Sequence, residues 1–531
     1  MKSLSGYKLL SQHKKFSVGA IIVLGIFFLF FYLPQIINAR IILFGSLPTW
    51  EVQNPVSTIF AMDFIPPTAG SLAAGDSTVP DAYLVDPAID TLLLLMEAKG
   101  IYLPKTVSHS SGIVGPDNIV LLKGNFQWTN RNTTSTDRMK GVIWQILQHP
   151  DGFTGEIIIC DNTQNFGTGI NHNDNNSEDS EQSIVDVVNT FVAKGYPVSY
   201  RDWANVWDVV VDEYSAGDYD DGFVYESSSK ISYPKFTSPS GNNYISLRYG
   251  IWDSNLLAYD LNRLCIVDFP VLKAHSWAGA TIAVKNWIGV LTTAYSSSRY
   301  GGSTLMQKNY FSGQYALVAK VMGVTFPKLT IVDAAWTSAS GPNNLSDTVN
   351  TKMLLGSTDP CAISWYAAKY ILTPIAVDPN NTDPDRLGSN YKSNLDGWTN
   401  CFQDSGFACT KDSLEISVYD REILSVTSSD NQVDIITPQF FQLHQNYPNP
   451  FNSQTVITFN LLQPANLQLH IYDTNGSLVK SLIESEARDV GSYQVNWDGT
   501  NDKDQNLSSG VYFYKLIVGD FSETKAMILE K

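Results

Sequence analysis

Residues 118–162, "NIVLLKGNFQWTNRNTTSTDRMKGVIWQILQHPDGFTGEIIICDN", decide the fold. Two short runs rich in Val, Ile and Leu, "NIVLLKGN" and "GEIIICDN", stand on either side of residues 137–149, where apolar residues recur at helical spacing. A strand, a helix and a second strand in this order predict parallel strands joined by a crossover helix. We therefore expect an α/β fold with a mostly parallel sheet flanked by helices.

The same rhythm continues over residues 59–410, which we assign to the α/β domain. Further buried strands are predicted at "PVSYRDW" (197–203), "LCIVDFP" (264–270) and "KLTIVDAAW" (328–336). A second helix is expected at residues 183–195, "SIVDVVNTFVAKG", because it ends in Lys-Gly and has Ser180 or Ser183 at its start. Residues 270–290, "PVLKAHSWAGATIAVKNWIGV", follow a predicted strand that Pro270 stops, and we expect a helix at the centre of "AGATIAVKNWIG".

Two further segments follow the α/β domain. Residues 411–439 are rich in Ser, Asp and Asn and poor in apolar residues, so they are interpreted as a linker. Residues 440–531 contain short alternating segments separated by Asn, Gly and Asp turns. This pattern predicts a small immunoglobulin-like β-sandwich.

The N-terminus predicts an export signal in residues 1–39, where four lysines precede an uncharged run from Phe16 to Ala39. Cleavage after Ala39 would leave residues 40–58 as the start of the mature chain. The run also has nearly the length of a membrane span, so an uncleaved signal anchor is the alternative, and the chain would then contact the membrane only through this segment.

Composition limits the classes of function. The 531 residues carry a formal net charge of −17, which argues against a nucleic-acid partner and favours solubility outside the cell. The five cysteines form no C-x-x-C pair, which excludes iron–sulfur and zinc-ribbon patterns. Cys401 and Cys409 could pair in an oxidising compartment, whereas Cys160 and Cys265 are predicted to be buried in strands.

Polar residues follow several predicted strands. Lys123 and Asn125 end the first strand of the opening stretch, and Lys273 and His275 follow "LCIVDFP". In sheets of this kind, ligands bind outside the carboxyl ends of the strands. Lysines at such ends, with Thr and Gly loops, predict an anion-binding cleft for a small carboxylate or phosphate compound.

This pattern of polar residues after the strands resembles that of the family called domain of unknown function 362, over most of residues 59–400. The resemblance rests on a Lys-x-Asn strand end, the Thr-rich loop 133–136, "P-x-x-K-x-H", "K-N-x-x-G", an "I-x-D" strand with a later Gly-Pro at Gly341 and Pro342, and "D-P-x-A". Where the family usually has a second acid after that last motif, this chain has Ser364. If that acid contributes to activity or metal binding, this member is altered or inactive.

The candidate site residues combine these observations. We expect catalytic roles for Lys285, whose pKa burial would lower, and for His275 as acid, base or metal ligand. Ligand-binding roles are expected for Lys123, Asn125, Lys273, Asn286, Asp333 and Asp359. Each has an ordinary structural interpretation as well: Lys285 can reach the surface from an amphipathic helix, and the two aspartates can cap helices or turns.

Cofactor and metal are not specified by the sequence. His275 and Lys285 are ten residues apart, and in this they resemble lactate-racemase-like enzymes that use a nickel-pincer nucleotide. The acidic tract 212–226 has aspartates at positions 218, 220 and 221 that could bind calcium, but it lacks the full EF-hand spacing, so a solvated insertion is preferred. An enzyme using Lys285 and His275 and a non-enzymatic secreted or cell-surface binding protein both remain as hypotheses.

The C-terminal segment resembles the sorting domain of the type IX (Por) secretion system. The features that match in order are "NYPNPFN" at 446–452, the Trp-Asp-Gly turn at 497–499, "SGVYFYKL" at 509–516 and a basic final residue. The resemblance implies export to the periplasm, transfer across the outer membrane by the secretion machinery, and a secreted or cell-surface location. An adhesive or spacer sandwich is the alternative.

Overall fold

The structure is a computed structural model. It describes residues 47–66, 77–128, 131, 133–163, 182–207, 209–229, 231–290, 316–341, 347–421, 423–424, 441–443, 446, 448–461, 465–474, 477–489, 491–503, 505–518 and 521–530. The expected signal or anchor in residues 1–39 lies outside this part of the chain. Among the described residues, no helix is long and apolar enough to span a bilayer.

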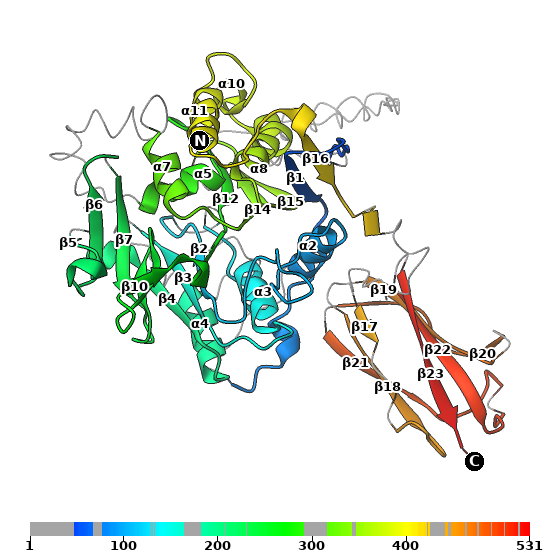
Figure 1. Ribbon diagram of the computed structural model, residues 1–531. Helices are drawn as coiled ribbons and strands as arrows, with labels where there is room; N and C mark the ends of the chain where they lie inside the picture. Colours follow the sequence, from blue (N-terminus) through cyan, green and yellow to red (C-terminus); the bar gives the residue numbers. More distant parts are fainter. Residues whose placement is uncertain are drawn as a thin grey trace, which may run out of the picture. The chain divides into compact units, whose positions relative to one another are not determined.

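One large sheet organises the α/β domain, with strands in the order β16-β1-β15-β14-β11-β2-β3-β4 (Figure 1). Its strands are β1 (Ser57–Met62), β2 (Ile119–Lys123), β3 (Glu156–Asp161), β4 (Val198–Asp202), β11 (Leu264–Asp268), β14 (Leu329–Ser338), β15 (Thr348–Ser357) and β16 (Ile416–Tyr419). The short strands β12 (Val271–His275) and β13 (Gly279–Thr281) branch from β14. The sheet therefore continues past residue 410, where the domain was expected to end.

The expectation of a mostly parallel sheet is confirmed only in part, because the sheet is mixed. Strands β14, β11, β2, β3 and β4 run parallel, as the strand–helix–strand pattern predicts. Strand β15, however, pairs antiparallel with both β14 and β1. The physical reason is that residues 339–347, which join β14 to β15, are too few for the crossover of a dozen or more residues that parallel neighbours need.

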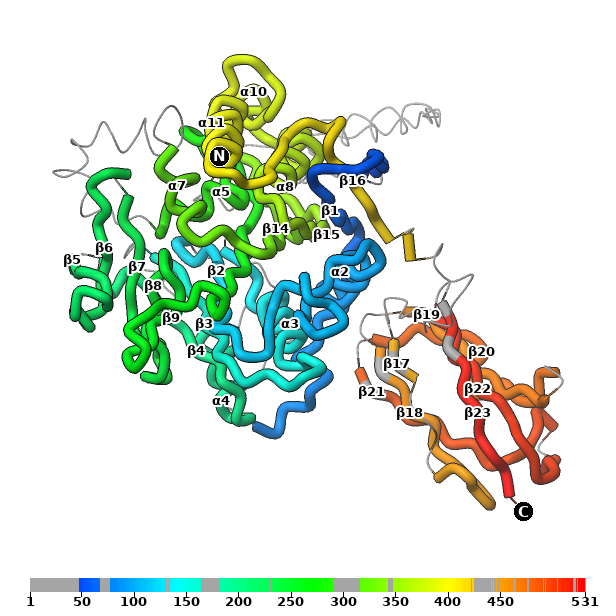
Figure 2. Tube along the Cα trace, viewed as in Figure 1, coloured from blue at the N-terminus to red at the C-terminus, as the bar shows by residue number. Residues whose placement is uncertain are grey.

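Helices cover both faces of this sheet (Figures 1 and 2). On one face α2 (Pro87–Glu97), α3 (Thr136–Leu147) and α4 (Ile184–Ala193) pack on alternate residues of the strands in one apolar core. On the other face lie α5 (Ala283–Asn286), α7 (Leu317–Val324), α8 (Pro360–Ala367) and α11 (Asn390–Asp404). Helix α3 confirms the predicted crossover helix, and Ser183 caps α4 through its hydrogen bond from the Asp186 N–H.

Residues 210–260 form a second sheet that the sequence analysis missed. Its strands, in spatial order, are β10 (Ala258–Asp260), β9 (Gly250–Asp253), β8 (Tyr244–Ser246), β7 (Ile231–Thr237), β6 (Gly222–Glu226) and β5 (Val210–Val211). The acidic tract belongs to this sheet, and the buried Lys235 ammonium donates to the carbonyls of Asp212 and Asp218 at 2.7 Å each. Oxygens of the acidic tract thus bind the ammonium group of a buried lysine.

The stretch from Pro270 to Val290 also differs from expectation. Pro270 ends β11, but the chain resumes pairing at once, with β12 parallel to β14 and antiparallel to β13. Lys273 and His275 therefore lie on a strand, and the helix is reduced to the four residues of α5. Gly279 permits this tight hairpin because it has a φ of +80° opposite His275.

The C-terminal region is a β-sandwich, as predicted. A three-stranded sheet contains β17 (Phe441–Leu443), β18 (Thr455–Leu461) and β21 (Gly491–Trp497), and a four-stranded sheet contains β19 (Ala465–Tyr472), β20 (Leu478–Arg488), β22 (Gly510–Val518) and β23 (Phe521–Leu529). Both sheets contribute to one core, which includes Phe459, Trp497 and Tyr514. Much of the linker expected at 411–439 lies outside the described residues.

We predict that Gly279→Ala destabilises the α/β domain more than Gly100→Ala does. Both glycines have a φ near +80°, so both variants carry the strain of about 1–2 kcal/mol of a left-handed residue. At Gly279, however, the added Cβ would lie 2.5 Å from the Asn381 carbonyl oxygen and from the Tyr391 Cβ, whereas at Gly100 it meets nothing within 4 Å. Equal midpoints of chemical unfolding for the two variants would contradict this account.

Candidate functional site

The candidate site begins at the carboxyl ends of three neighbouring parallel strands. Lys123, the last residue of β2, lies in register with Asp268 at the end of β11 and with Cys160 on β3, so Asp161 is one step beyond. All of these side chains are at most 2% exposed. The parallel register thus gathers a lysine and two aspartates at one buried edge, next to α5 on the opposite face from α2, α3 and α4.

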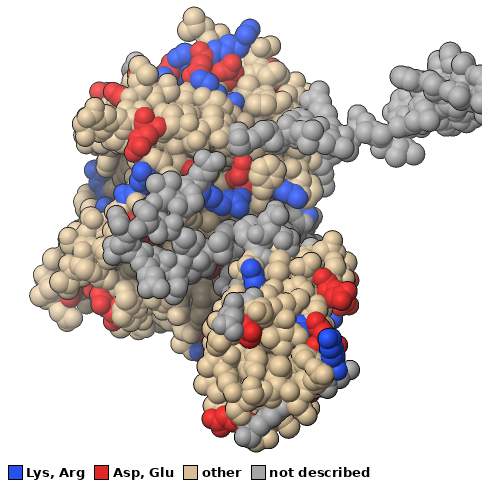
Figure 3. Space-filling view, turned by 90° about the vertical axis from the view of Figure 1, so that its right-hand side faces the viewer, with Lys and Arg blue, Asp and Glu red and all other residues tan. Residues whose placement is uncertain are grey.

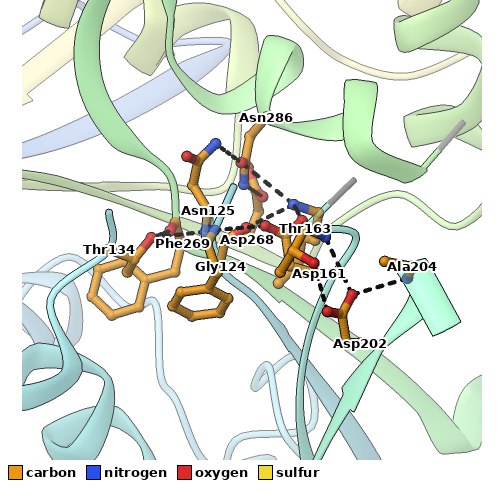
Figure 4. Close-up of polar contacts among 12 residues, drawn as sticks. Gly124, Asn125, Thr134, Asp161, Thr163, Asp202, Ala204, Asp268, Phe269 and Asn286 are labelled. Atoms are coloured by element: carbon orange, nitrogen blue, oxygen red, sulfur yellow. Dashed lines mark hydrogen bonds and ion pairs between the residues drawn. The ribbon is translucent and has the colours of Figure 1, made fainter. Parts of the chain in front are cut away.

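Lys123 forms a buried ion pair with Asp161, which is labelled in Figure 4. Its Nζ donates to Asp161 Oδ1 at 2.6 Å and to the Gly124 carbonyl at 2.6 Å. Asp161 Oδ2 accepts the Phe126 N–H at 2.6 Å. Burial raises the pKa of Asp161 above its usual range, and the Lys123 charge opposes that rise. Because both carboxylate oxygens accept hydrogen bonds, we assign the ionised form.

Two asparagines connect this pair to the rest of the site. Asn125 Nδ2 donates to Asn286 Oδ1 at 2.8 Å, and Asn286 Nδ2 donates to Asp268 Oδ1 at 2.8 Å. Lys273 Nζ in turn donates to Asn125 Oδ1 at 2.7 Å. Each amide thus has its orientation fixed by what it donates and accepts. The network therefore links β2, β11, β12 and α5 through buried side chains.

The positive charges of the buried lysines affect one another's pKa values. Burial and then the charge of Lys123 lower the pKa of Lys285 to about 7. Burial and then the charge of Lys285 lower the pKa of Lys273 well below its usual range, against the opposing effect of Asp161. Lys285 is only 6% exposed, so the interpretation as a surface lysine on an amphipathic helix is wrong. The lysines predicted from the sequence converge on one place.

His275 joins this group as a neutral side chain. Burial, followed by the charges of Lys285 and Lys273, lowers its pKa to about 2. Its Nδ1 accepts the backbone N–H groups of Trp277 and Ala278, each at 3.2 Å. A ring nitrogen that accepts carries no proton, so the proton is on Nε2. This geometry favours His275 as a hydrogen-bond donor over a general base acting through Nδ1.

Asp268 is the site residue that the sequence analysis did not select. Burial raises its pKa to about 7, against the lowering effect of Lys123 and of the hydrogen bond from Asn286. A signal was present, because Asp268 ends the strand "LCIVD" as Lys123 ends "IVLLK" and Asp161 ends "EIIICD". Asp268 and Lys285 therefore both titrate close to neutral pH.

Asp333 supports the site from the adjacent strand β14. It is fully buried, its Oδ2 accepts the Ser135 N–H at 2.8 Å, and its Oδ1 accepts the Ala335 N–H at 3.2 Å. The neighbouring Thr134 donates to the Phe269 carbonyl at 2.8 Å and accepts the Asn125 N–H at 2.9 Å. Asp333 thus holds the Thr-rich loop in place, and that loop positions Asn125. Gly341 is described, whereas Pro342 lies outside the described residues.

Asp359 is not joined to the network by its hydrogen bonds. It is the N-cap of α8, where its Oδ1 accepts the N–H groups of Cys361 and Ala362, and its Oδ2 accepts the Thr410 N–H at 2.8 Å. Burial raises its pKa to about 6, and these three donors oppose the rise. Ser364, which stands where the resembled family usually has an acid, is fully buried on the same helix.

The buried cations contrast with the molecular surface. Figure 3 shows one face, on which basic and acidic side chains lie beside one another. Surface ion pairs such as Lys369 with Asp385 and Lys392 with Asp396 account for this kind of pattern. Some surface charges are thus paired locally, whereas Lys123, Lys273 and Lys285 share a buried region with Asp161 and Asp268.

Comparisons with known proteins identify two regions. Residues 235–369 match the family model of the domain of unknown function 362 (DUF362). This range contains Lys273, His275 and Lys285 but begins after Lys123 and Asn125. Residues 446–518 match the FlgD Ig-like domain. No curated protein matches the chain.

Solved structures are only distantly similar. Dimeric latent PorU from Porphyromonas gingivalis is 20% identical over 22% of this chain and 10% of its own, with a TM-score of 0.16. PorZ, a surface component of the type IX secretion system of the same organism, is 20% identical over 17% of this chain and 11% of its own, with a TM-score of 0.13. A β-glucosidase from Listeria innocua is 12% identical over 17% of this chain and 16% of its own, with a TM-score of 0.12. The chain spans about a tenth of the length of the two secretion proteins.

We predict that Lys123→Met destabilises the α/β domain by about 3–5 kcal/mol, because it leaves the Asp161 carboxylate buried without its cation. Lys194→Met is the matched control, since Lys194 pairs with an Asp81 side chain that is 59% exposed, and a loss of at most about 1 kcal/mol is expected there. Chemical unfolding of both variants measures the difference. Similar losses would mean that the buried pair does not hold the strand ends together.

Proposed function

We propose that the network around Lys273 and Lys285 binds a small carboxylate or phosphate compound. The observation that carries this proposal is the convergence of three lysines and His275 at one buried edge of the sheet, where the lysine charges act on one another and on His275. Burial, and then the charge of a neighbouring lysine, lower the pKa values of Lys273 and Lys285. An anion placed among the lysines would relieve the repulsion between their charges and favour the charged forms.

Burial and hydrogen bonding define the kind of ligand. Asn125 and Asn286 are held rigid, so the donors around them are oriented before a ligand arrives. The Nε2–H of His275 is a neutral donor suited to a carboxylate or phosphate oxygen. Lys123, Lys273 and Lys285 are at most 6% exposed, so binding requires the ligand to lose most of its water. A compact anion meets these conditions better than an extended one.

The same groups support acid–base or nucleophilic chemistry on such a ligand. With a pKa near 7, Lys285 exists partly as a neutral amine at physiological pH, the form that acts as a base or attacks a carbonyl carbon. Asp268, also near 7, is a matched proton donor or acceptor. The competing hypothesis is a secreted binding protein that holds the anion without turnover. Turnover by the wild type that Lys285→Ala abolishes would favour the enzyme.

We predict that anion affinity falls as the pH rises from about 6 to about 8. Below pH 7 Lys285 is protonated and Asp268 is largely neutral, which favours an anion; above pH 7 Lys285 loses its charge and Asp268 gains one. Each titration weakens binding by up to about tenfold per pH unit. Titration calorimetry with inorganic phosphate and a panel of small carboxylates measures this dependence.

Two variants separate the contributions of Lys285 and Asp268 to anion affinity. Lys285→Ala should remove most of the affinity, and Asp268→Asn should retain affinity but with a shallower pH dependence. Lys99→Ala is the control, because Lys99 pairs with Glu51 at the surface and should leave binding unchanged. Binding of phosphate and carboxylates that is equal in Lys285→Ala and the wild type, in a folded protein, would refute the proposed site.

We further propose that the chain is exported and reaches the outer cell surface or the medium by type IX secretion. Support comes from the N-terminal signal pattern and from the order of "NYPNPFN", the Trp-Asp-Gly turn and "SGVYFYKL" in the C-terminal segment. That segment is an independent sandwich whose own core includes Trp497. A sandwich with its own core can be recognised by a secretion machinery whatever the α/β domain does.

Deletion of residues 440–531 should trap the protein in the periplasm of a host that has type IX secretion, because the predicted sorting signal is removed. Fractionation of cells, with immunodetection of a tag placed after residue 424, beyond β16, measures the location. The full-length tagged chain in the same host is the control. Normal release of the truncated protein would refute sorting by this domain and favour the spacer interpretation.

A further inference from the structure

Two cysteines far apart in the sequence meet in the core of the α/β domain. Cys361 lies in the first turn of α8 and is fully buried, and Cys409 lies in the segment after α11 and is 3% exposed. Their sulfur atoms and a carboxylate oxygen of Asp359 all lie within 4.8 Å of one another. All five cysteines are free thiols in this structure, including Cys401 and Cys409, which could have paired. Cys409 instead faces Cys361.

The segment that carries Cys409 is firmly held. Its N–H donates to the Phe407 carbonyl at 2.9 Å, and its own carbonyl accepts from Gln403 Nε2 at 2.8 Å. The next residue, Thr410, donates its N–H to Asp359 and its hydroxyl to Glu415. The backbone on both sides is thus fixed by contacts that do not involve sulfur, so the two thiols are brought together by the fold itself.

We propose that Cys361 and Cys409 form a disulfide when the exported chain folds in an oxidising compartment. In the reaction the two thiols lose two protons and two electrons and one S–S bond forms, while the disulfide of a thiol–disulfide oxidoreductase, or of oxidised glutathione, is reduced to two thiols. The compartment rests on the proposed export, whereas the pairing rests on geometry alone. The bond would tie α8 to the segment that leads into β16.

A metal ion fits this cluster less well. Zinc with cysteine ligands is four-coordinate, and the described residues supply three ligand atoms. Both Asp359 oxygens already accept backbone N–H groups. Metal binding also needs thiolates, yet contact with Cys361, burial and the Asp359 charge raise the pKa of Cys409 well above its usual range. A disulfide is neutral and needs no further partner in a buried site.

The burial of both thiols also determines at which stage of folding the disulfide can form. A thiolate must attack the donor disulfide, and neither sulfur is accessible in the folded protein. Oxidation therefore belongs to folding, before the segment around Cys409 closes over α8. The folded and reduced protein should react slowly with oxidised glutathione, and a moderate concentration of denaturant should accelerate the reaction.

The test is a peptide map of the full chain, purified without reductant from cells lysed in a denaturant together with an alkylating agent, so that buried thiols are also blocked. We expect one linked peptide pair, Cys361 with Cys409, and alkylated Cys160 and Cys265. In a parallel sample, the reduced full chain is equilibrated with glutathione redox buffers in moderate denaturant and mapped in the same way. Linkage in the glutathione sample alone would support the pair and count against export. Linkage in neither sample would overturn the inference.

Variants and metal analysis complete the test. Cys401→Ser should keep the link, and Cys409→Ser should lose it together with the effect of reductant on the melting temperature, expected to be a fall of roughly 5 °C in the wild type. A Cys401–Cys409 link in the wild type would overturn the proposal. So would about one divalent metal ion per chain that is lost in both Cys361→Ser and Cys409→Ser.

Discussion

The buried pair of Lys123 and Asp161 is the constraint on which the arrangement of the site depends. Removing two charges from water costs several kcal/mol each, and this is offset only when geometry and further hydrogen bonds satisfy both groups. Here the Gly124 carbonyl and the Phe126 N–H supply those bonds. Because the two partners are the last residues of β2 and β3, the pair also fixes how the loops after these strands leave the sheet. Asn125 is then presented to Asn286 and Lys273.

The sequence analysis predicted the polar residues at the carboxyl edge of the sheet better than it predicted how the strands of the sheet pair. Lys123 and Lys273 were identified because they break apolar runs, and Lys123 does end a parallel strand, whereas Lys273 lies in the middle of β12. Asp268 was overlooked because Phe269 and Pro270 follow it, so the strand seemed to end in a stop signal rather than in a functional group. Its partner, Asn286, lies on another element, and pairing across elements leaves no local pattern.

Other misses have the same origin. The mixed sheet depends on β15 pairing with both β14 and β1, and no local pattern reports which neighbours a strand finds. The sheet over residues 210–260 was hidden because its strands are short and carry many aspartates and tyrosines. Lys235 makes that composition stable by donating to backbone and side-chain oxygens of Asp218 from a fully buried position. Charged side chains in this chain thus often stabilise the fold, so a charged residue by itself does not identify a ligand-binding site.

That distinction separates Asp359 from the lysines. The two oxygens of the buried Asp359 carboxylate accept three backbone N–H groups. The fold itself therefore satisfies this carboxylate, and its burial needs no ligand. Lys273 and Lys285 differ, because burial and their mutual repulsion both disfavour the charged forms while the fold still brings them together. A protein selected only for stability gains nothing from that arrangement, since apolar side chains of similar volume would pack at lower cost. The cost of burying lysines that repel one another is not required for stability, and this cost supports the proposal of an anion site at this edge of the sheet.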